Sequence, residues 1–110
     1  MIEDTLAKIE ARLQSSEAIS EDKRRELQQL LATLKSEVAR LSETHAEQAE
    51  SIAAFTGLSA HEATRERRNP ELLRLSLRGL TSSVGEFEKS HPNLVQIVNA
   101  ISNLLSGLGI

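Results

Sequence analysis

The stretch Leu27–Phe55, LQQLLATLKSEVARLSETHAEQAESIAAF, decides the fold that the sequence predicts. Its seam positions recur at alternating intervals of four and three residues, and seven of the ten positions counted from Arg24 are apolar. From the first leucine onward the seam positions are Leu27, Leu31, Leu34, Val38, Leu41, His45, Gln48, Ile52 and Phe55. A strict seven-residue repeat predicts a left-handed coiled coil or bundle seam. We therefore expect one continuous helix over residues 21–56, roughly 54 Å long at 1.5 Å per residue, which ends at Gly57.

Two consecutive positions of this seam, His45 and Gln48, are polar. A polar seam residue commonly sets the register or the number of partners, and a histidine there could make association depend on pH. His45 has no short ligand spacing to His61 or His91, and the chain contains no cysteine. The sequence therefore favours a register role for His45 and predicts no metal or other cofactor.

The segment before the long helix predicts a shorter antiparallel neighbour. Its apolar stripe is Ile2, Leu6, Ile9 and Leu13. Ser20 is followed by two acidic residues, which is typical of a helix N-cap and its first turn. The first helix, about 20 Å long on the same rise, can cover less than half of the long helix.

The second half of the chain predicts further helices. A capping box at Ser59–Glu62 predicts a short helix that runs toward Arg68. The pair Asn69–Pro70 predicts the start of a third helix, and a break at residues 81–83 stays open as an alternative to a continuous one. The last helix follows Pro92, and its apolar positions are Leu94, Val98, Ile101, Leu105 and Leu108.

These patterns predict an all-α fold, with helical hairpins around one long heptad-patterned helix in a coiled-coil or helical-bundle dimer. The expected units are an N-terminal helical hairpin with the long helix at 1–57, a connector with a short helix at 58–69, and a C-terminal helical hairpin at 70–110. The C-terminal hairpin is expected to pack on the long helix. Because one chain supplies few helices for such a long seam, we expect a homo-oligomer, most simply a dimer.

The phrase Phe87-Glu88-Lys89-Ser90-His91-Pro92 is the most distinctive short motif. Proline suits the first turn of a helix, where its missing N–H would have no partner. Glu88 could face the free amides of the last helix or His91. We interpret Phe87, Glu88, His91 and Pro92 as a rigid helix corner rather than an acid–base pair, since no nucleophile, metal ligand or phosphate loop accompanies them.

Three arginines, Arg65, Arg67 and Arg68, form the densest basic cluster. Two glutamates, Glu62 and Glu66, interleave with them, the net charge of the chain is −3, and its aromatic residues are two phenylalanines. Nucleic-acid binding usually combines an uncompensated basic surface with aromatic side chains that stack on bases. A solvated charged face is therefore the preferred interpretation, and DNA association stays an alternative.

The C-terminal 21 residues, from Ser90 to Ile110, contain no charged side chain. This segment is too short to span a bilayer and lacks the basic face of an interfacial helix. We expect it to be buried against the other helices, with membrane association as the alternative. The acidic N-terminal residues do not resemble a signal peptide, and the absence of cysteine suits a cytoplasmic protein.

The corner Phe87, Glu88, His91 and Pro92, together with the ending Leu108, Gly109 and Ile110, resembles a family of short bacterial proteins described only as a domain of unknown function. This resemblance implies a small bacterial helical protein with no established activity, and it supplies no catalytic residues.

The sequence as a whole predicts a non-enzymatic protein that serves as an oligomerising interaction or scaffold module. Two alternatives stay open: a peripheral membrane protein that uses its uncharged last helix, and a DNA-associated protein that uses the cluster Arg65–Arg68. The identity of a protein partner is not predicted.

Overall fold

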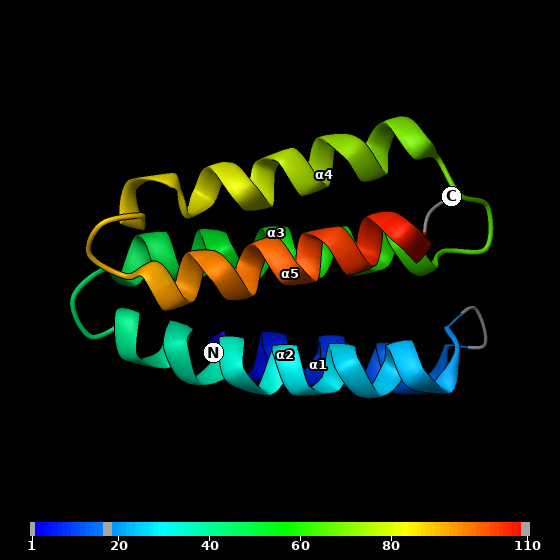
Figure 1. The fold of residues 1–110 in the computed structure, drawn as a ribbon, viewed down its shortest axis with the longest axis horizontal. Helices are drawn as coiled ribbons and strands as arrows, with labels where there is room; N and C mark the ends of the chain where they lie inside the picture. Colours follow the sequence, from blue (N-terminus) through cyan, green and yellow to red (C-terminus); the bar gives the residue numbers. More distant parts are fainter. Residues whose placement is uncertain (1, 17–18, 109–110) are drawn as a thin grey trace.

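Five α-helices are formed by the residues that the structure, a computed structural model, describes, namely 2–16 and 19–108, with side chains from Asp4 onward. They run lengthwise through a body of 37 × 24 × 22 Å (Figure 1). The helices are α1 (Ile2–Ser15), α2 (Glu21–Leu41), α3 (Ala46–Thr64), α4 (Pro70–Ser83) and α5 (Pro92–Leu108), with a 3-10 turn, η1 (Gly85–Phe87). Because the described residues contain no strand, the predicted all-α class is confirmed.

Three of the predicted helix starts are confirmed. The Ser20 hydroxyl accepts a hydrogen bond from the Lys23 N–H at 3.4 Å. The Asn69 carboxamide oxygen accepts from the N–H groups of Glu71 and Leu72, at 3.1 and 3.2 Å. Pro70 and Pro92 begin α4 and α5, where the fixed φ of proline suits the first turn.

The predicted continuous helix over 21–56 is wrong, because the chain turns between Leu41 and Ala46. The Leu41 carbonyl accepts hydrogen bonds from the N–H groups of Thr44 and His45, at 3.1 and 2.8 Å. The Ser42 hydroxyl donates to the Ala39 carbonyl at 2.7 Å. Serine and threonine side chains that bond to nearby backbone compete with helix propagation, and here they accompany a full reversal of the chain.

Helix α3 continues seven residues beyond Gly57, so the predicted helix stop is wrong, and the predicted boundary at 57/58 lies inside this helix. The capping box at Ser59–Glu62 lies inside this helix and begins no separate one. Helix α3 contacts each of the other four α-helices. Its central place explains why small residues such as Ala49, Ala53 and Ala60 are buried along it, since they let neighbouring backbones approach.

The third predicted helix, α4, passes through Gly79 without a break and ends at Ser83. The ring of Phe55 on α3 packs against Gly79. After Val84 the chain forms η1 and three turn residues before α5 begins. The predicted stripe therefore continues over Val84 and Phe87, which are buried, although the helix itself stops before them.

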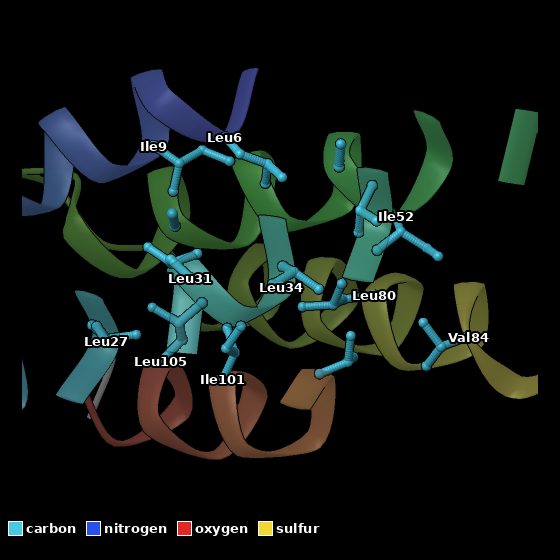
Figure 2. Packing of buried hydrophobic residues seen from close by; sticks show 14 of the residues in the cluster. Leu6, Ile9, Leu27, Leu31, Leu34, Ile52, Leu80, Val84, Ile101 and Leu105 are labelled. Atoms are coloured by element: carbon cyan, nitrogen blue, oxygen red, sulfur yellow. The ribbon is translucent and has the colours of Figure 1, made fainter. Parts of the chain in front are cut away.

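One hydrophobic core joins all five helices. Figure 2 shows Leu6 and Ile9 from α1 above side chains of α2 and α3, with Leu80 and Ile101 on the opposite side. The core also contains six of the nine predicted seam residues, Leu27, Leu31, Leu34, Val38, Leu41 and Ile52. These six are buried within one chain. The uncharged helix α5 is buried against α2, α3 and α4, as predicted.

Candidate functional site

The alternating helix directions place the candidate residues at the two ends of the bundle and on one side of it. The α2–α3 turn and the α4–α5 corner lie at the left end of Figure 1. The ends of α1, α3 and α5 lie at the right end, beside the starts of α2 and α4. Residues that are distant in sequence therefore meet at each end.

At the left end, the seam residue His45 lies beside Phe87 and His91 of the predicted helix corner. The ring of Phe87 lies between those of His45 and His91, with ring centroids 5.3 Å from each, and both contacts are edge-to-face. The two histidine rings are 6.3 Å apart. We call these three residues the histidine corner. Phe87 is buried at the predicted helix corner, and its ring partners are the two histidines.

Both histidines of the corner have one ring nitrogen beside an adjacent hydroxyl. The Nδ1 atom of His45 lies 2.8 Å from the Thr44 hydroxyl, and that of His91 lies 2.9 Å from the Ser90 hydroxyl. Among the described residues, Glu88 forms no ion pair or hydrogen bond with His91. The contacts of both rings with Phe87 are those of a packed helix corner.

The remaining two seam residues are partly exposed and lie apart from each other. Gln48 lies in the first turn of α3, close to the α2–α3 turn. Phe55 lies at the α3–α4 contact on Gly79. His45 and Gln48 thus follow a reversal of the chain and do not occupy the middle of a long helix.

The right end contains a hollow of about 720 Å³, which we call the arginine cleft. Its lining residues are Arg12, Ser15, Ser16, His61, Thr64, Arg65, Glu66 and Arg68. They come from the last turn of α1, the last turn of α3 and the segment that follows it. Three guanidinium groups therefore face one lining carboxylate. Of the three arginines singled out in the sequence, Arg65 and Arg68 line the cleft and Arg67 does not.

The contact between Arg12 and His61 joins residues 49 positions apart. Arg12 Nη1 lies 2.9 Å from His61 Nδ1. A guanidinium group can only donate, so Nδ1 is the acceptor and the ring proton belongs on Nε2. The arginine charge is therefore not neutralised by this contact, and His61 Nε2 lies 3.9 Å from Glu62 Oε2.

The other two arginines of the cleft have different partners. Arg65 Nη1 donates to Glu62 Oε1 at 2.9 Å, and this carboxylate is 6% exposed. Arg68 Nη1 donates to the Leu108 carbonyl at 2.6 Å, at the end of α5. A cation at a helix C-terminus is favourable because carbonyl groups there lack intrahelical partners. Arg68 thus keeps its charge while it joins α5 to the α3–α4 connection.

A third candidate surface lies on α3 and α4, and we call Leu58, Leu72 and Leu75 the leucine patch. Their exposed fractions are 46%, 42% and 50%, whereas the large apolar residues of the core are at most 7% exposed. The contact of Phe55 with Gly79 sets the register of the antiparallel pair. Leu58 is one turn along α3 from Phe55, and Leu75 is one turn back from Gly79, so the two leucines lie on neighbouring turns.

The sequence did not single out the leucine patch, nor Arg12 and His61 of the arginine cleft. Leu72 and Leu75 lie off the 4-3 stripe of their helix, which is the signal that could have identified them. Nothing local in the sequence indicates that Arg12 meets His61, because this contact depends on how α1 packs on α3.

Metal-binding clusters and bilayer-spanning helices are absent from the residues that the structure describes. Within residues 2–16 and 19–108, no three or more His, Asp or Glu side chains gather in a way that could hold a metal ion. None of the described helices combines the length and apolar character needed to cross a bilayer. The last two residues of the ending in the predicted resemblance, Gly109 and Ile110, lie outside the described residues.

Comparison with known families identifies a match that covers most of the chain. Residues 27–110, from the middle of α2 to the last residue, match the family described as Domain of unknown function (DUF4404). This range includes the histidine corner, the leucine patch and the α3 side of the arginine cleft, but not α1. Comparison with curated proteins and with solved structures gives no significant match.

Proposed function

The chain belongs to the family described as Domain of unknown function (DUF4404), and we propose that it is a non-enzymatic helical interaction module that forms a homodimer through its leucine patch. The proposed setting is the bacterial cytoplasm. Because the family description carries no activity, the proposal depends on the surface of this chain.

The observation that carries the proposal is the exposure of three neighbouring leucines on a bundle whose core is otherwise well covered. Single exposed leucines are common on monomeric proteins. Three on adjacent turns of two packed helices form a contiguous apolar surface, and such surfaces often mark interaction sites. Leu75 lies one turn from Gly79, where the ring of Phe55 on α3 packs closely against α4.

A second copy of the chain is the occupant that the chemistry of this surface favours. In a two-fold dimer the same patch meets itself, so it must be self-complementary, and an apolar centre meets this condition without charge repulsion. Glu71 and Arg74 form an ion pair on the exposed side of α4 and supply both signs of charge near the patch. A standard interface buries about 800 Å² per partner, of which three half-exposed leucines supply only the centre. We therefore expect a dissociation constant in the micromolar range.

Sedimentation velocity over a range of concentrations tests the proposal. The wild-type chain is expected to shift from monomer to dimer, and the double variant Leu72→Glu/Leu75→Glu is expected to remain monomeric. The matched control is Ala32→Glu, which adds a carboxylate to the exposed face of α2, a helix that does not contact α4.

Two results would contradict the proposal. One is a wild-type chain that sediments as a monomer at all concentrations up to about 1 mM. The other is a double variant that dimerises as well as the control, with both variants folded by circular dichroism. The second result would place the interface on another surface.

A further inference from the structure

We propose that the arginine cleft binds a small phosphorylated, polyhydroxylated compound, such as a sugar phosphate. This inference goes beyond dimerisation and concerns a different surface, because the cleft lies at one end of the bundle and the leucine patch lies on its side. It follows from the number of donors in the cleft, the acceptors around them and the size of the hollow.

The donors of the cleft suit a phosphate group. Guanidinium groups remain charged and bind phosphate oxygens through paired N–H donors. Each of Arg12, Arg65 and Arg68 uses one Nη atom in a contact with the protein, and a guanidinium group has five N–H donors in all. Arg12 and Arg68 contact an imidazole nitrogen and a carbonyl rather than a carboxylate, so an anion can neutralise their charges.

The remaining lining groups suit the hydroxyls of the same ligand. The hydroxyl of Ser15 donates to the Arg12 carbonyl at 3.1 Å, and that of Thr64 donates to the Ala60 carbonyl at 2.7 Å. With their protons used in this way, the two oxygens offer lone pairs as acceptors. Glu66 adds a carboxylate. Acceptors beside a cationic centre favour a ligand that has both O–H donors and an anionic group.

The size and composition of the cleft favour a phosphorylated compound that is larger than inorganic phosphate. Its volume of about 720 Å³ is within the range of small-molecule sites and exceeds what inorganic phosphate alone would fill. No Phe, Tyr or Trp side chain lines it, so a nucleotide base could stack only on the ring of His61 or on a guanidinium group. A second hollow of about 360 Å³, lined by Thr5, Lys8, Ile9, Arg12 and Gly57, shares Arg12 with it. This neighbouring surface adds another cation, Lys8.

The test is a titration of the ¹⁵N-labelled full chain followed by NMR, with glucose 6-phosphate as the probe. Saturable shifts are expected at the amides of Arg12, His61, Arg65 and Arg68. Inorganic phosphate is expected to bind the same residues more weakly, and glucose is expected to cause no shift. Vesicles of phosphatidylglycerol test whether a lipid headgroup supplies the phosphate, and a short DNA duplex tests the nucleic-acid alternative.

Three variants assign the binding to the cleft. Arg12→Gln and Arg68→Gln are each expected to weaken binding of glucose 6-phosphate at least about tenfold, the loss that corresponds to one charge-assisted interaction. Arg67→Gln removes the same charge from the same segment but not from the cleft, and it is expected to change the affinity less than about twofold. Amide spectra of the free variants show whether each one is folded.

Several results would overturn the proposal. The first is the absence of saturable shifts with both glucose 6-phosphate and inorganic phosphate up to about 20 mM. The second is an equal loss of affinity in Arg67→Gln and Arg12→Gln, which would indicate general charge attraction. The third is binding of DNA or of vesicles without binding of the sugar phosphate. Each outcome is independent of dimerisation, since the titration can be repeated on Leu72→Glu/Leu75→Glu.

Discussion

The hydroxyl of Ser59 is a polar group that the bundle buries without a partner. Ser59 is fully buried on α3, and its Oγ atom has no hydrogen-bond partner among the described residues. A buried donor that loses its bonds to water costs about 1–3 kcal/mol when it finds no replacement. The packing at this position therefore tolerates a serine because of its small size, not because of its hydroxyl group.

Removal of this hydroxyl is expected to stabilise the protein. Ser59→Ala should raise the free energy of unfolding by about 1–2 kcal/mol, since it removes the desolvation cost and adds a better helix former. The control Ser51→Ala lies on the exposed side of the same helix and should gain about 0.5 kcal/mol or less. Urea denaturation compares the two, and a loss of stability in Ser59→Ala would show that the hydroxyl has a partner.

Gly79 has a specific reason to be a glycine. A Cβ atom there would lie 2.9 Å from the Phe55 Cζ atom and closer still to Cδ1 and Cε1. Gly79→Ala should gain about 1 kcal/mol of helix propensity but lose about 1–3 kcal/mol through overpacking. We expect a net loss of stability in thermal denaturation.

Two further variants identify the cause of that loss. Gly85→Ala, where nothing lies within 4 Å of the added carbon, should be neutral or slightly stabilising. Adding Phe55→Leu to Gly79→Ala should recover part of the loss, because a smaller side chain leaves room for the methyl group. If Gly79→Ala is as stable as Gly85→Ala, the ring does not constrain this position.

The starts of the helices could be predicted from sequence because their signals are local. Ser20, Asn69 and Pro92 act through bonds and dihedral angles within a few residues of themselves, so the local sequence contains the information that fixes each helix start.

The turn between α2 and α3 was missed for the opposite reason. The spacing of four from Leu41 to His45 continues the heptad numbering across the turn, so periodicity alone cannot distinguish a reversal from a straight helix. The feature of the sequence that could have indicated this turn is the group of polar residues Ser42, Thr44, His45 and Gln48.

Only those parts of the candidate sites whose residues are neighbours in sequence could be predicted. The corner from Phe87 to Pro92 is local and was recognised, whereas its contact with His45 depends on the missed turn. Arg65 and Arg68 were noted as a charged cluster. The arginine cleft needs Arg12 and His61, which meet only when α1 packs on α3, so no spacing rule could indicate it.

The start of α3 combines a weak cap with an aromatic contact. His45 occupies the N-cap position, and its side chain makes no capping bond to the amides of α3 that the structure describes. His45→Ala should lose about 1 kcal/mol through the contact with Phe87. His45→Asn should be close to the wild type in chemical denaturation, because an asparagine cap contributes about 1 kcal/mol in compensation. Equal losses in both variants would show that the turn does not accept a side-chain cap.

The five-helix bundle buries within one chain the apolar stripes that the sequence analysis expected a second copy to cover. The stripe that seemed too long for one chain to cover is divided by the α2–α3 turn into two antiparallel helices, each shorter than the 37 Å body. Helix α1 and helix α5 then cover the apolar faces that α2 and α3 present. The exposed large apolar side chains among the described residues lie on α3 and α4, so the proposed association and the folding of the chain would depend on different residues.

This separation predicts that stability and association respond to different substitutions. Leu34 is fully buried in the core, and Leu34→Ala should lower the free energy of unfolding by about 3 kcal/mol at any protein concentration. The same variant should retain the wild-type sedimentation behaviour under conditions in which it is folded. Leu72→Glu/Leu75→Glu should instead weaken association at least about tenfold and, at about 1 μM, change the unfolding free energy by less than about 0.5 kcal/mol. If Leu34→Ala abolished association in a folded chain, the heptad seam would be an interface between copies, and the leucine patch would not be.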